Sequence, residues 1–369
     1  MYVNGKHYYA LWVDETNNAV KIVNQLKIPY EFEICEITSY LELVNAIKDM
    51  HLRGAPLIGV AGAFAVWLAS LEAKKTSNPE FFLNNAYNNI VSARPTAVNL
   101  KFAASLVYNK VIQCKNSENR AEIALTTAKY FYNSEIENFK KIGENGLPLI
   151  KKLASQKNGE PVNILTHCNA GWLACGDYGT ATSAIYLAHK KGIKIHVWID
   201  ETRPRLQGAK LTAWEMNNEK IPFTVIADNT GGYLMQEGMV DIVIVGADRV
   251  AANGDVANKI GTYLKALAAF NNHIPFYVAL PSSTIDFGLQ QGVHHIAIEK
   301  RNKNEILQIE GITKNGNVET INIMPENYSV ANYAFDITPA HFVTGLITEQ
   351  GIVSAKKEDI IKLYSKKAI

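Results

Sequence analysis

The spacing of apolar and polar residues divides the chain near residue 160. Beyond that point, short runs rich in valine and isoleucine alternate with helical segments that begin near Gly179, Gly208, Thr230 and Gly261. The runs cover residues 162–167, 194–200, 223–227, 241–247 and 275–280. Strands that are apolar on both faces and separated by helices are typical of a parallel sheet covered by helices. We therefore predict an α/β, Rossmann-like domain with a parallel sheet over residues 151–369.

The first 150 residues follow a mainly helical pattern. Short strands are predicted within residues 7–13 and 29–37, and helices over residues 39–50, 98–112 and 119–142. Residues 55–73 are apolar nearly all round, which indicates a buried helix. Pro56 and the glycines near its start favour a core helix over a membrane span. The pattern predicts a small, mainly helical N-terminal domain with short antiparallel strands over residues 1–150.

Composition narrows the class of protein. The chain has 369 residues, of which 47% are hydrophobic and 20% charged, as in an ordinary globular protein. Its formal net charge is +2, so the chain lacks the strongly basic composition of a nucleic-acid-binding protein. The four cysteines form no CxxC pair, so neither a zinc site nor a disulfide framework is expected. With no signal-peptide layout at the N-terminus, we expect a soluble, cytoplasmic protein without membrane or nucleic-acid partners.

Polar and glycine-rich clusters follow every predicted strand of the second domain. Ligands of open parallel sheets bind outside the carboxyl ends of the strands, so these clusters are candidates for an active site. Cys168 is of particular interest because it lies one residue beyond its strand, beside a glycine-rich turn. The clusters are His167–Gly171, Asp200–Pro204, Asp228–Asn229, Gly246–Arg249 and Pro281–Thr284.

Three features suggest that the ligand is an anion. Gly171, Gly176 and Gly179 precede a predicted helix, whose free N–H groups attract phosphate. Arg53 and Arg94 lie in apolar, proline-flanked settings, and the arginine fork suits phosphate oxygens. Residues 253–259 are interpreted as a long polar loop of the kind that contacts substrate hydroxyl or phosphate groups. Neither GxGxxG nor a Walker motif is present, which argues against a dinucleotide or a nucleoside triphosphate.

Several long motifs carry a family resemblance. The chain resembles the methylthioribose-1-phosphate isomerases, whose superfamily includes archaeal ribose-1,5-bisphosphate isomerases and regulatory subunits of a eukaryotic translation initiation exchange factor. The resemblance spans residues 11–350 and implies a helical N-terminal domain, a Rossmann-like C-terminal domain and a homodimer. The motifs that carry it are RGAPLIGVAGAFA, SARPTAVNL, THCNAG, DETRPRLQGAKLTAWE, VGADRVAANGDVANKIGTY and PFYVALPSSTID.

The resemblance also implies an activity and a set of site residues. The reaction is aldose–ketose isomerisation of a 5-substituted ribose 1-phosphate in methionine salvage, with no metal or cofactor. Cys168 in THCNAG and Asp248 in GADR match the catalytic positions of the family. The positions that match its substrate contacts are Arg53, Gly54, Ala55, Arg94, Gln207, Asn258 and Lys259.

Asp248 and Cys168 can supply the groups that the isomerisation requires. Because the anomeric oxygen of a sugar 1-phosphate is esterified, opening the ring requires an acid, and Asp248 can serve if burial keeps it protonated. An ion pair with Arg249, or a helix cap, is the alternative role of this aspartate, and either would leave it ionised. Cys168 can remove the C2 proton as a thiolate, or remain a thiol while a hydride passes from C2 to C1. We expect His167 to be a supporting hydrogen-bonding residue.

Alternatives remain open from the sequence. The chain departs from the family pattern at Trp172 and Tyr233, which leaves the 5-substituent undefined: methylthio, plain methyl or a more polar group. An isomerase of 5-deoxyribose 1-phosphate or of ribose 1,5-bisphosphate is one alternative. A non-enzymatic regulatory subunit that binds sugar phosphates is another, although such a subunit is expected to lack Cys168 and Asp248.

Overall fold

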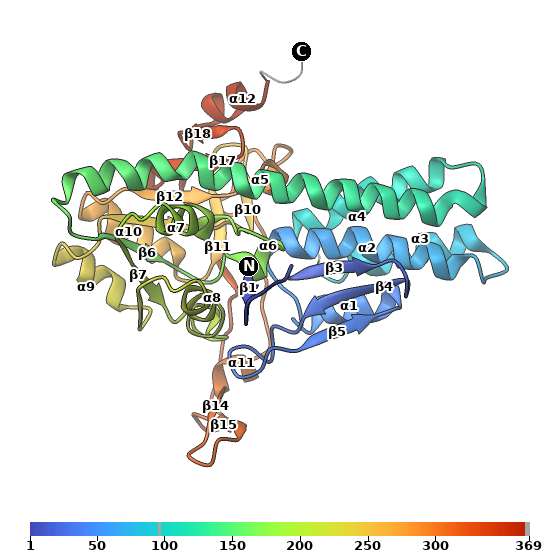
Figure 1. The fold of residues 1–369 in the computed structure, drawn as a ribbon, viewed down its shortest axis with the longest axis horizontal. Helices are drawn as coiled ribbons and strands as arrows, with labels where there is room; N and C mark the ends of the chain where they lie inside the picture. The colour runs from blue at the N-terminus through green and yellow to red at the C-terminus, as the bar shows by residue number, and fades with distance from the viewer. Residues whose placement is uncertain (95–96, 366–369) are drawn as a thin grey trace.

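A seven-stranded sheet organises the C-terminal half of the protein (Figure 1). The computed structural model describes residues 1–94 and 97–365. The strand order is β18-β17-β12-β9-β6-β7-β8, and all neighbours are parallel except the edge strand β18. This confirms the predicted Rossmann-like sheet. In chain order the strands are β6 (Val162–Thr166), β7 (Ile195–Asp200), β8 (Phe223–Ile226), β9 (Ile242–Val245), β12 (Phe276–Ala279), β17 (Gly345–Thr348) and β18 (Gly351–Val353).

Alternate residues of these strands enter two separate cores. Ile164 packs on one face of the sheet beneath α5 and α7, and Leu165 packs on the other face beneath α9 and α10. Both residues are fully buried, as are the valines and isoleucines of β9. Burial on both faces explains the continuous apolar runs in the sequence. The helices are α5 (Arg120–Gln156), α7 (Ala181–Lys190), α8 (Ala213–Asn218), α9 (Thr230–Gln236) and α10 (Thr262–Asn271).

The N-terminal half surrounds one apolar helix, α2 (Ala55–Ala73). It is long and apolar enough to cross a membrane, but 89% of that apolar window is buried inside the protein, as expected for a core helix. Helices α1 (Tyr40–Lys48), α3 (Pro79–Val91) and α4 (Val98–Gln113) pack against it. The antiparallel strands predicted for this half are present and are joined by others: β1 (Tyr2–Val3), β2 (Lys6–His7), β3 (Leu11–Asp14), β4 (Ala19–Val23) and β5 (Ile34–Ile37).

Helix α5 runs along both halves of the molecule (Figure 1). It contacts α2 and α4 near its start, and α7 and β17 further on. The helix predicted over residues 119–142 continues to Gln156, despite two glycines and Pro148. Packing outweighs their low helix propensity, because Gly143 and Gly146 allow α7 to approach closely. Residue 150, the predicted boundary between the two domains, lies inside α5.

A second, four-stranded sheet lies beside the first and has the order β13-β10-β11-β16. The interpretation of residues 253–259 as a long polar loop is wrong, because β10 and β11 form an antiparallel hairpin with a short turn at Asn253 and Gly254. Asn258 and Lys259 lie on β11 and are buried, so their polarity marks a site and not a solvent-exposed loop. The strands are β10 (Arg249–Ala251), β11 (Val256–Lys259), β13 (Ile285–Asp286) and β16 (Phe335–Thr338).

The remaining elements are short. A hairpin formed by β14 and β15 projects from the body of the protein (Figure 1). The elements are η1 (Ser117–Asn119), α6 (Trp172–Cys175), the π-helical turn η2 (Gly208–Thr212), η3 (Ser282–Thr284), α11 (Asn304–Leu307), β14 (Gln308–Ile312), β15 (Val318–Asn322), η4 (Ala340–Phe342) and α12 (Lys357–Ser365).

The close packing of α5 on α7 generates a stability prediction. A Cβ at Gly143 would overlap Ser183 Oγ and lie 3.0 Å from Leu187 Cδ1. Gly143→Ala should therefore lower the free energy of unfolding by about 1–3 kcal/mol. This loss exceeds the stabilisation expected from the higher helix propensity of alanine. In the control Gly232→Ala, the new Cβ would meet only Ala268 Cβ at 3.7 Å, so stability should be unchanged or slightly higher. Urea unfolding of both variants measures the difference, and equal stabilities would contradict this packing.

Candidate active site

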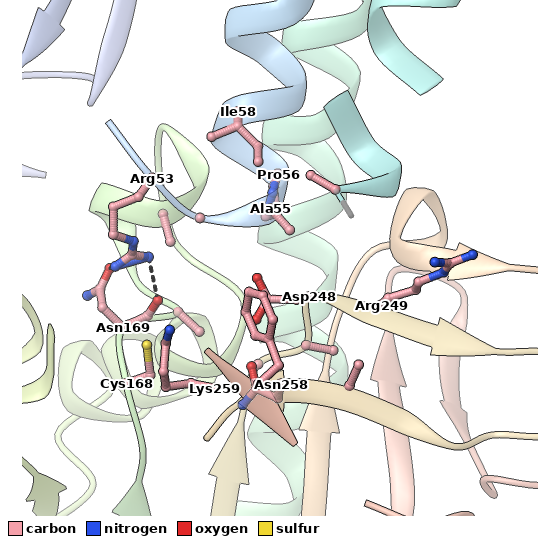
Figure 2. Close-up of a pocket in the computed structure, with 18 of the residues that line it drawn as sticks. Arg53, Ala55, Pro56, Ile58, Cys168, Asn169, Asp248, Arg249, Asn258 and Lys259 are labelled. Carbon is pink, nitrogen blue, oxygen red and sulfur yellow. Dashed lines mark hydrogen bonds between the residues drawn. The ribbon is translucent and has the colours of Figure 1, made fainter. Parts of the chain in front are cut away.

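A pocket between the start of α2 and the carboxyl ends of β6 and β9 brings the predicted residues together (Figure 2). Strand β11 forms another wall of this pocket. Of the five strand exits, those after β6 and β9 line the pocket. The other three, Asp200–Pro204, Asp228–Asn229 and Pro281–Thr284, are not among its lining residues. Every residue predicted for the site lines it: Arg53, Gly54, Ala55, Arg94, Cys168, Gln207, Asp248, Asn258 and Lys259.

Cys168 occupies a turn that begins where β6 ends. Its backbone is in the left-handed region, with φ of +65°, which is unusual for a residue with a side chain. Its N–H donates to Thr202 Oγ1 at 2.8 Å, and its carbonyl accepts from Thr212 Oγ1 at 2.6 Å. Burial raises the pKa of the thiol, Arg53 and Lys259 oppose this shift, and Asp248 adds to it. The resting site therefore holds a thiol near neutral pH.

Asp248 lies between β9 and β10 and faces the pocket, whereas Arg249 points away from it (Figure 2). Arg249 Nε donates to Asp286 at 3.1 Å, which rules out the ion pair with Asp248 considered from the sequence. Within residues 1–94 and 97–365, the Asp248 carboxyl group has no hydrogen-bond or ion-pair partner. Burial raises its pKa, against the opposing effects of Lys259, Arg94 and Arg53. Burial thus shifts the pKa of this carboxyl group in the direction that acid catalysis requires.

Three cationic side chains enter the pocket. Arg53 donates to Asn169 Oδ1 at 2.8 Å and to the Asn169 carbonyl at 2.7 Å. Arg94 forms an ion pair with Glu299 at 3.0 Å. Lys259 is buried, and its Nζ lies 4.9 Å from the centre of the Phe335 ring. These groups give the pocket the positive charge that a phosphate group requires.

Lys259 differs from the two arginines in its electrostatic environment. Burial lowers the pKa of its ammonium group, Cys168 and Asp248 oppose this, and the nearby arginines lower it further. Among the residues that the structure describes, no carboxylate is paired with it. A bound phosphate would supply the missing negative charge and favour the ammonium form.

Two uncharged contacts complete the wall of the pocket. Gln207 is buried, and within the described part of the chain its Oε1 has no hydrogen-bond partner, so it can accept from a sugar hydroxyl group. Asn258 donates to Thr262 Oγ1 at 3.0 Å. Gly54 precedes α2 with φ of +99°, and a Cβ there would lie 2.6 Å from Ala174. Only glycine permits this approach of the start of α2 to α6.

The glycines proposed to hold phosphate have another function. Gly171, Gly176 and Gly179 do not line the pocket, and each allows a close internal contact instead. A Cβ at Gly171 would overlap the Glu215 carboxylate, and one at Gly179 would lie 2.6 Å from the Cα of Gly171. The backbone at the start of α2, with Gly54 and Ala55, is the helix N-terminus that lines the pocket.

The departures from the family pattern also lie outside this pocket. Trp172 is fully buried and stacks on Trp214, with ring centres 6.2 Å apart. Tyr233 is 59% exposed on α9. Neither is among the lining residues, so the interpretation of these positions as determinants of the 5-substituent is not supported.

Sequence reasoning missed the residues that position the arginines. Asn169 holds Arg53 across 116 positions of the chain, and Glu299 holds Arg94 across 205. Asn169 follows Cys168 directly, and this adjacency was the one available signal. Glu215, the last residue of DETRPRLQGAKLTAWE, accepts from Asn169 Nδ2 at 2.8 Å and so links that motif to Arg53.

His167 precedes Cys168, lines the same pocket and belongs to a buried cluster with Asp200 and Lys265. Its Nδ1 lies 2.8 Å from Asp200 Oδ2, and its Nε2 donates to the Ile260 carbonyl at 2.8 Å. Both ring nitrogens are engaged, as expected of a supporting residue. His167, Asp200 and Asp228 place ligand atoms within 4.8 Å of one another, but Lys265 Nζ lies 3.2 Å from Asp200 Oδ2. The lysine thus already supplies a cation to this cluster.

The comparison with protein families identifies the class. The model of the Initiation factor 2 subunit family matches residues 51–355, which contain the whole pocket except Met50. The chain belongs to this family, within which it groups with the methylthioribose-1-phosphate isomerases. Proteins of that name from Desulfatibacillum aliphaticivorans and Sinorhizobium medicae are 49% and 47% identical to it, and each match covers 100% of both chains.

Solved structures agree with this placement. The 5-methylthioribose 1-phosphate isomerase from Pyrococcus horikoshii OT3 has a TM-score of 0.83 and 36% identity, with 98% of this chain and 97% of that chain covered. The translation initiation factor eIF-2B subunit delta from A. fulgidus has a TM-score of 0.77 and 35% identity, covering 97% and 100%. The fold alone therefore does not separate an isomerase from a regulatory subunit.

Proposed function

We propose that this protein is an aldose–ketose isomerase that converts 5-methylthioribose 1-phosphate into 5-methylthioribulose 1-phosphate in methionine salvage. The observation that carries the proposal is the meeting of Cys168 and Asp248 in one pocket with three cationic side chains. The names of full-length relatives at 47–49% identity support the same substrate. A purely regulatory subunit would have no need for a thiol and an acid at this position.

In the proposed reaction, Asp248 is the acid that opens the ring. The phosphate on C1 binds among Arg53, Arg94 and Lys259, while protonated Asp248 donates to the ring oxygen as the bond from C1 to that oxygen breaks. The hydroxyl hydrogen of C2 is released as its carbonyl forms, and it restores the proton to Asp248. Gln207 accepts from a hydroxyl group of the open sugar. No group outside the pocket is needed for this proton balance.

Cys168 acts on the hydrogen that moves between C2 and C1. Because burial raises the pKa of its thiol, the resting pocket favours the route in which Cys168 stays protonated and a hydride passes from C2 to C1. The thiol then lines the path of the hydride and helps to exclude water. The thiolate route would require the bound substrate to lower the pKa of the Cys168 thiol again. The negative charge of a dianionic phosphate would instead raise this pKa further.

Four large apolar residues in the wall of the pocket support an apolar group at the 5-position of the sugar. Met50, Ile58, Ile296 and Phe335 line the same pocket. Its cations are Arg53, Arg94 and Lys259, since the Arg249 side chain points toward Asp286. A substrate with one phosphate and one apolar substituent fits this combination of cationic and apolar side chains better than a bisphosphate does. A second phosphate would require further cationic groups.

We also propose the cellular setting and the assembly. The protein acts in the cytoplasm, where the reduced state of its four free cysteines is maintained. It forms a homodimer, as the family resemblance implies. Its reaction uses no metal ion and no cofactor, because the acid and the thiol supply the groups that isomerisation requires.

A substrate panel tests the proposed function. Ketose formation is measured with 5-methylthioribose 1-phosphate, 5-deoxyribose 1-phosphate and ribose 1,5-bisphosphate. We expect the first to have the highest kcat/KM, by about tenfold or more over the deoxy sugar, because an apolar pocket gains from the methylthio group. Highest activity with the bisphosphate would replace the proposed substrate. Absence of activity with all three sugars would favour the regulatory alternative.

Substitution of the two reacting groups tests their roles. Cys168→Ser and Asp248→Asn should each lower kcat by about 100-fold or more. The first replaces the thiol on the hydride path with a more strongly hydrated hydroxyl group, and the second removes the acid that opens the ring. Cys114→Ser is the control, since Cys114 lies at the end of α4 and its thiol donates to the Asn116 carbonyl away from the pocket. Near-normal turnover of either site variant, in a folded protein, would refute the assignment.

A further inference from the structure

Two residues in the left-handed conformation meet at the ends of adjacent strands. Cys168 follows β6 with φ of +65°, and Thr202 follows β7 with φ of +64°. The N–H of Cys168 donates to Thr202 Oγ1 at 2.8 Å, so the two unusual backbones are joined directly. Non-glycine residues in this region carry a conformational cost of about 1–3 kcal/mol each, and such residues cluster at functional sites.

Thr202 is held in place from several directions. It is the one β-branched residue with positive φ among the described residues, and it is fully buried. Asp228 accepts from the N–H groups of Thr202 and Arg203, each at 2.7 Å. The Thr202 hydroxyl donates to the Asp200 carbonyl at 3.0 Å. Its remaining lone pairs are therefore directed to the N–H of Cys168.

Thr212 fixes the opposite side of Cys168. It lies at the end of the π-helical turn η2 and is buried. Its hydroxyl donates to the Cys168 carbonyl at 2.6 Å and accepts from Asn169 Nδ2 at 3.2 Å. Both peptide groups of Cys168 are thus held by threonine hydroxyls, and both threonines belong to DETRPRLQGAKLTAWE. Neither threonine lines the pocket.

We propose that Thr202 and Thr212 are positioning residues that hold Cys168 in its left-handed conformation and thereby direct its thiol into the pocket. This assignment rests on the proposed isomerase function of Cys168. Without either hydroxyl, the Cys168 backbone can relax toward the ordinary regions of φ, which lie about 1–2 kcal/mol lower per residue. The resulting rotation would move Sγ while leaving Arg94, Lys259 and Gln207 in place.

Kinetic measurements on Thr202 variants test the proposal. Thr202→Val preserves the shape but removes the hydroxyl, so kcat should fall about 10- to 100-fold, as expected for a misplaced reacting group, with KM changed less than about threefold. Thr202→Ser keeps the hydroxyl and should restore most of the activity. Thr166→Val is the matched control, because this buried threonine on β6 donates to the Ile244 carbonyl and not to Cys168. It should retain wild-type kinetics.

A second readout does not depend on catalysis. Alkylation of Cys168 by iodoacetamide, followed by mass spectrometry, should change at least about threefold in rate in Thr202→Val, since access to the thiol depends on its orientation. Alkylation of Cys114 and the thermal midpoint serve as internal references. If the wild-type protein lacks isomerase activity, the proposed function fails and the alkylation rates alone decide the positioning role.

Thr212→Val is measured in parallel and should change kcat and alkylation in the same way. Unchanged kcat and alkylation in both folded valine variants would overturn the proposal. Equal loss of activity in the serine and valine variants would overturn it as well, because the hydroxyl would then not be the determining group. Failure of both valine variants to fold would also contradict it, since a positioning role is confined to the site.

Discussion

The way in which the chain leaves β6 is the constraint on which the site depends. Glu215, fully buried, accepts from the N–H groups of Trp172 at 2.9 Å and Leu173 at 3.0 Å, from Asn169 Nδ2 and from the Tyr186 hydroxyl group. Gly171 is required because a side chain there would overlap this carboxylate. One buried acid therefore fixes the segment that follows Cys168, from Asn169 to Leu173, and through Asn169 it also orients an arginine.

Burial then determines the chemistry that this turn can support. Removal from water raises the pKa values of Cys168 and Asp248 and lowers that of Lys259, so each of the three groups is shifted toward its neutral form. The negative charge of a phosphate dianion raises all three pKa values. It therefore favours the charged form of Lys259 and the neutral forms of Cys168 and Asp248. Substrate binding and acid catalysis thus favour the same arrangement of charges: a cationic end for phosphate and a protonated acid near the ring oxygen.

Periodicity predicted the sheet and the buried helix, because both depend on burial. The strand-exit rule indicated the clusters that contain Cys168 and Asp248, and the family resemblance implied the individual site residues. What depends on partners distant in the sequence could not be predicted. Helix α5 continues past Gly143 because α7 packs there, and Asn258 and Lys259 are polar in a strand because they face a pocket. Gly171 suggested phosphate binding from its spacing, yet it serves the contact with Glu215, which lies 44 positions further along.

The protonation state of Asp248 tests the central claim most directly. An infrared difference spectrum between the wild-type protein and Asp248→Asn, recorded near neutral pH, separates a protonated carboxyl group from a carboxylate by the carbonyl stretching band. The account predicts a protonated carboxyl band that is present in the wild type and lost in the variant, because burial raises the pKa of this aspartate. A difference spectrum that contains only carboxylate bands would show an ionised Asp248 and would contradict its role as the acid that opens the ring.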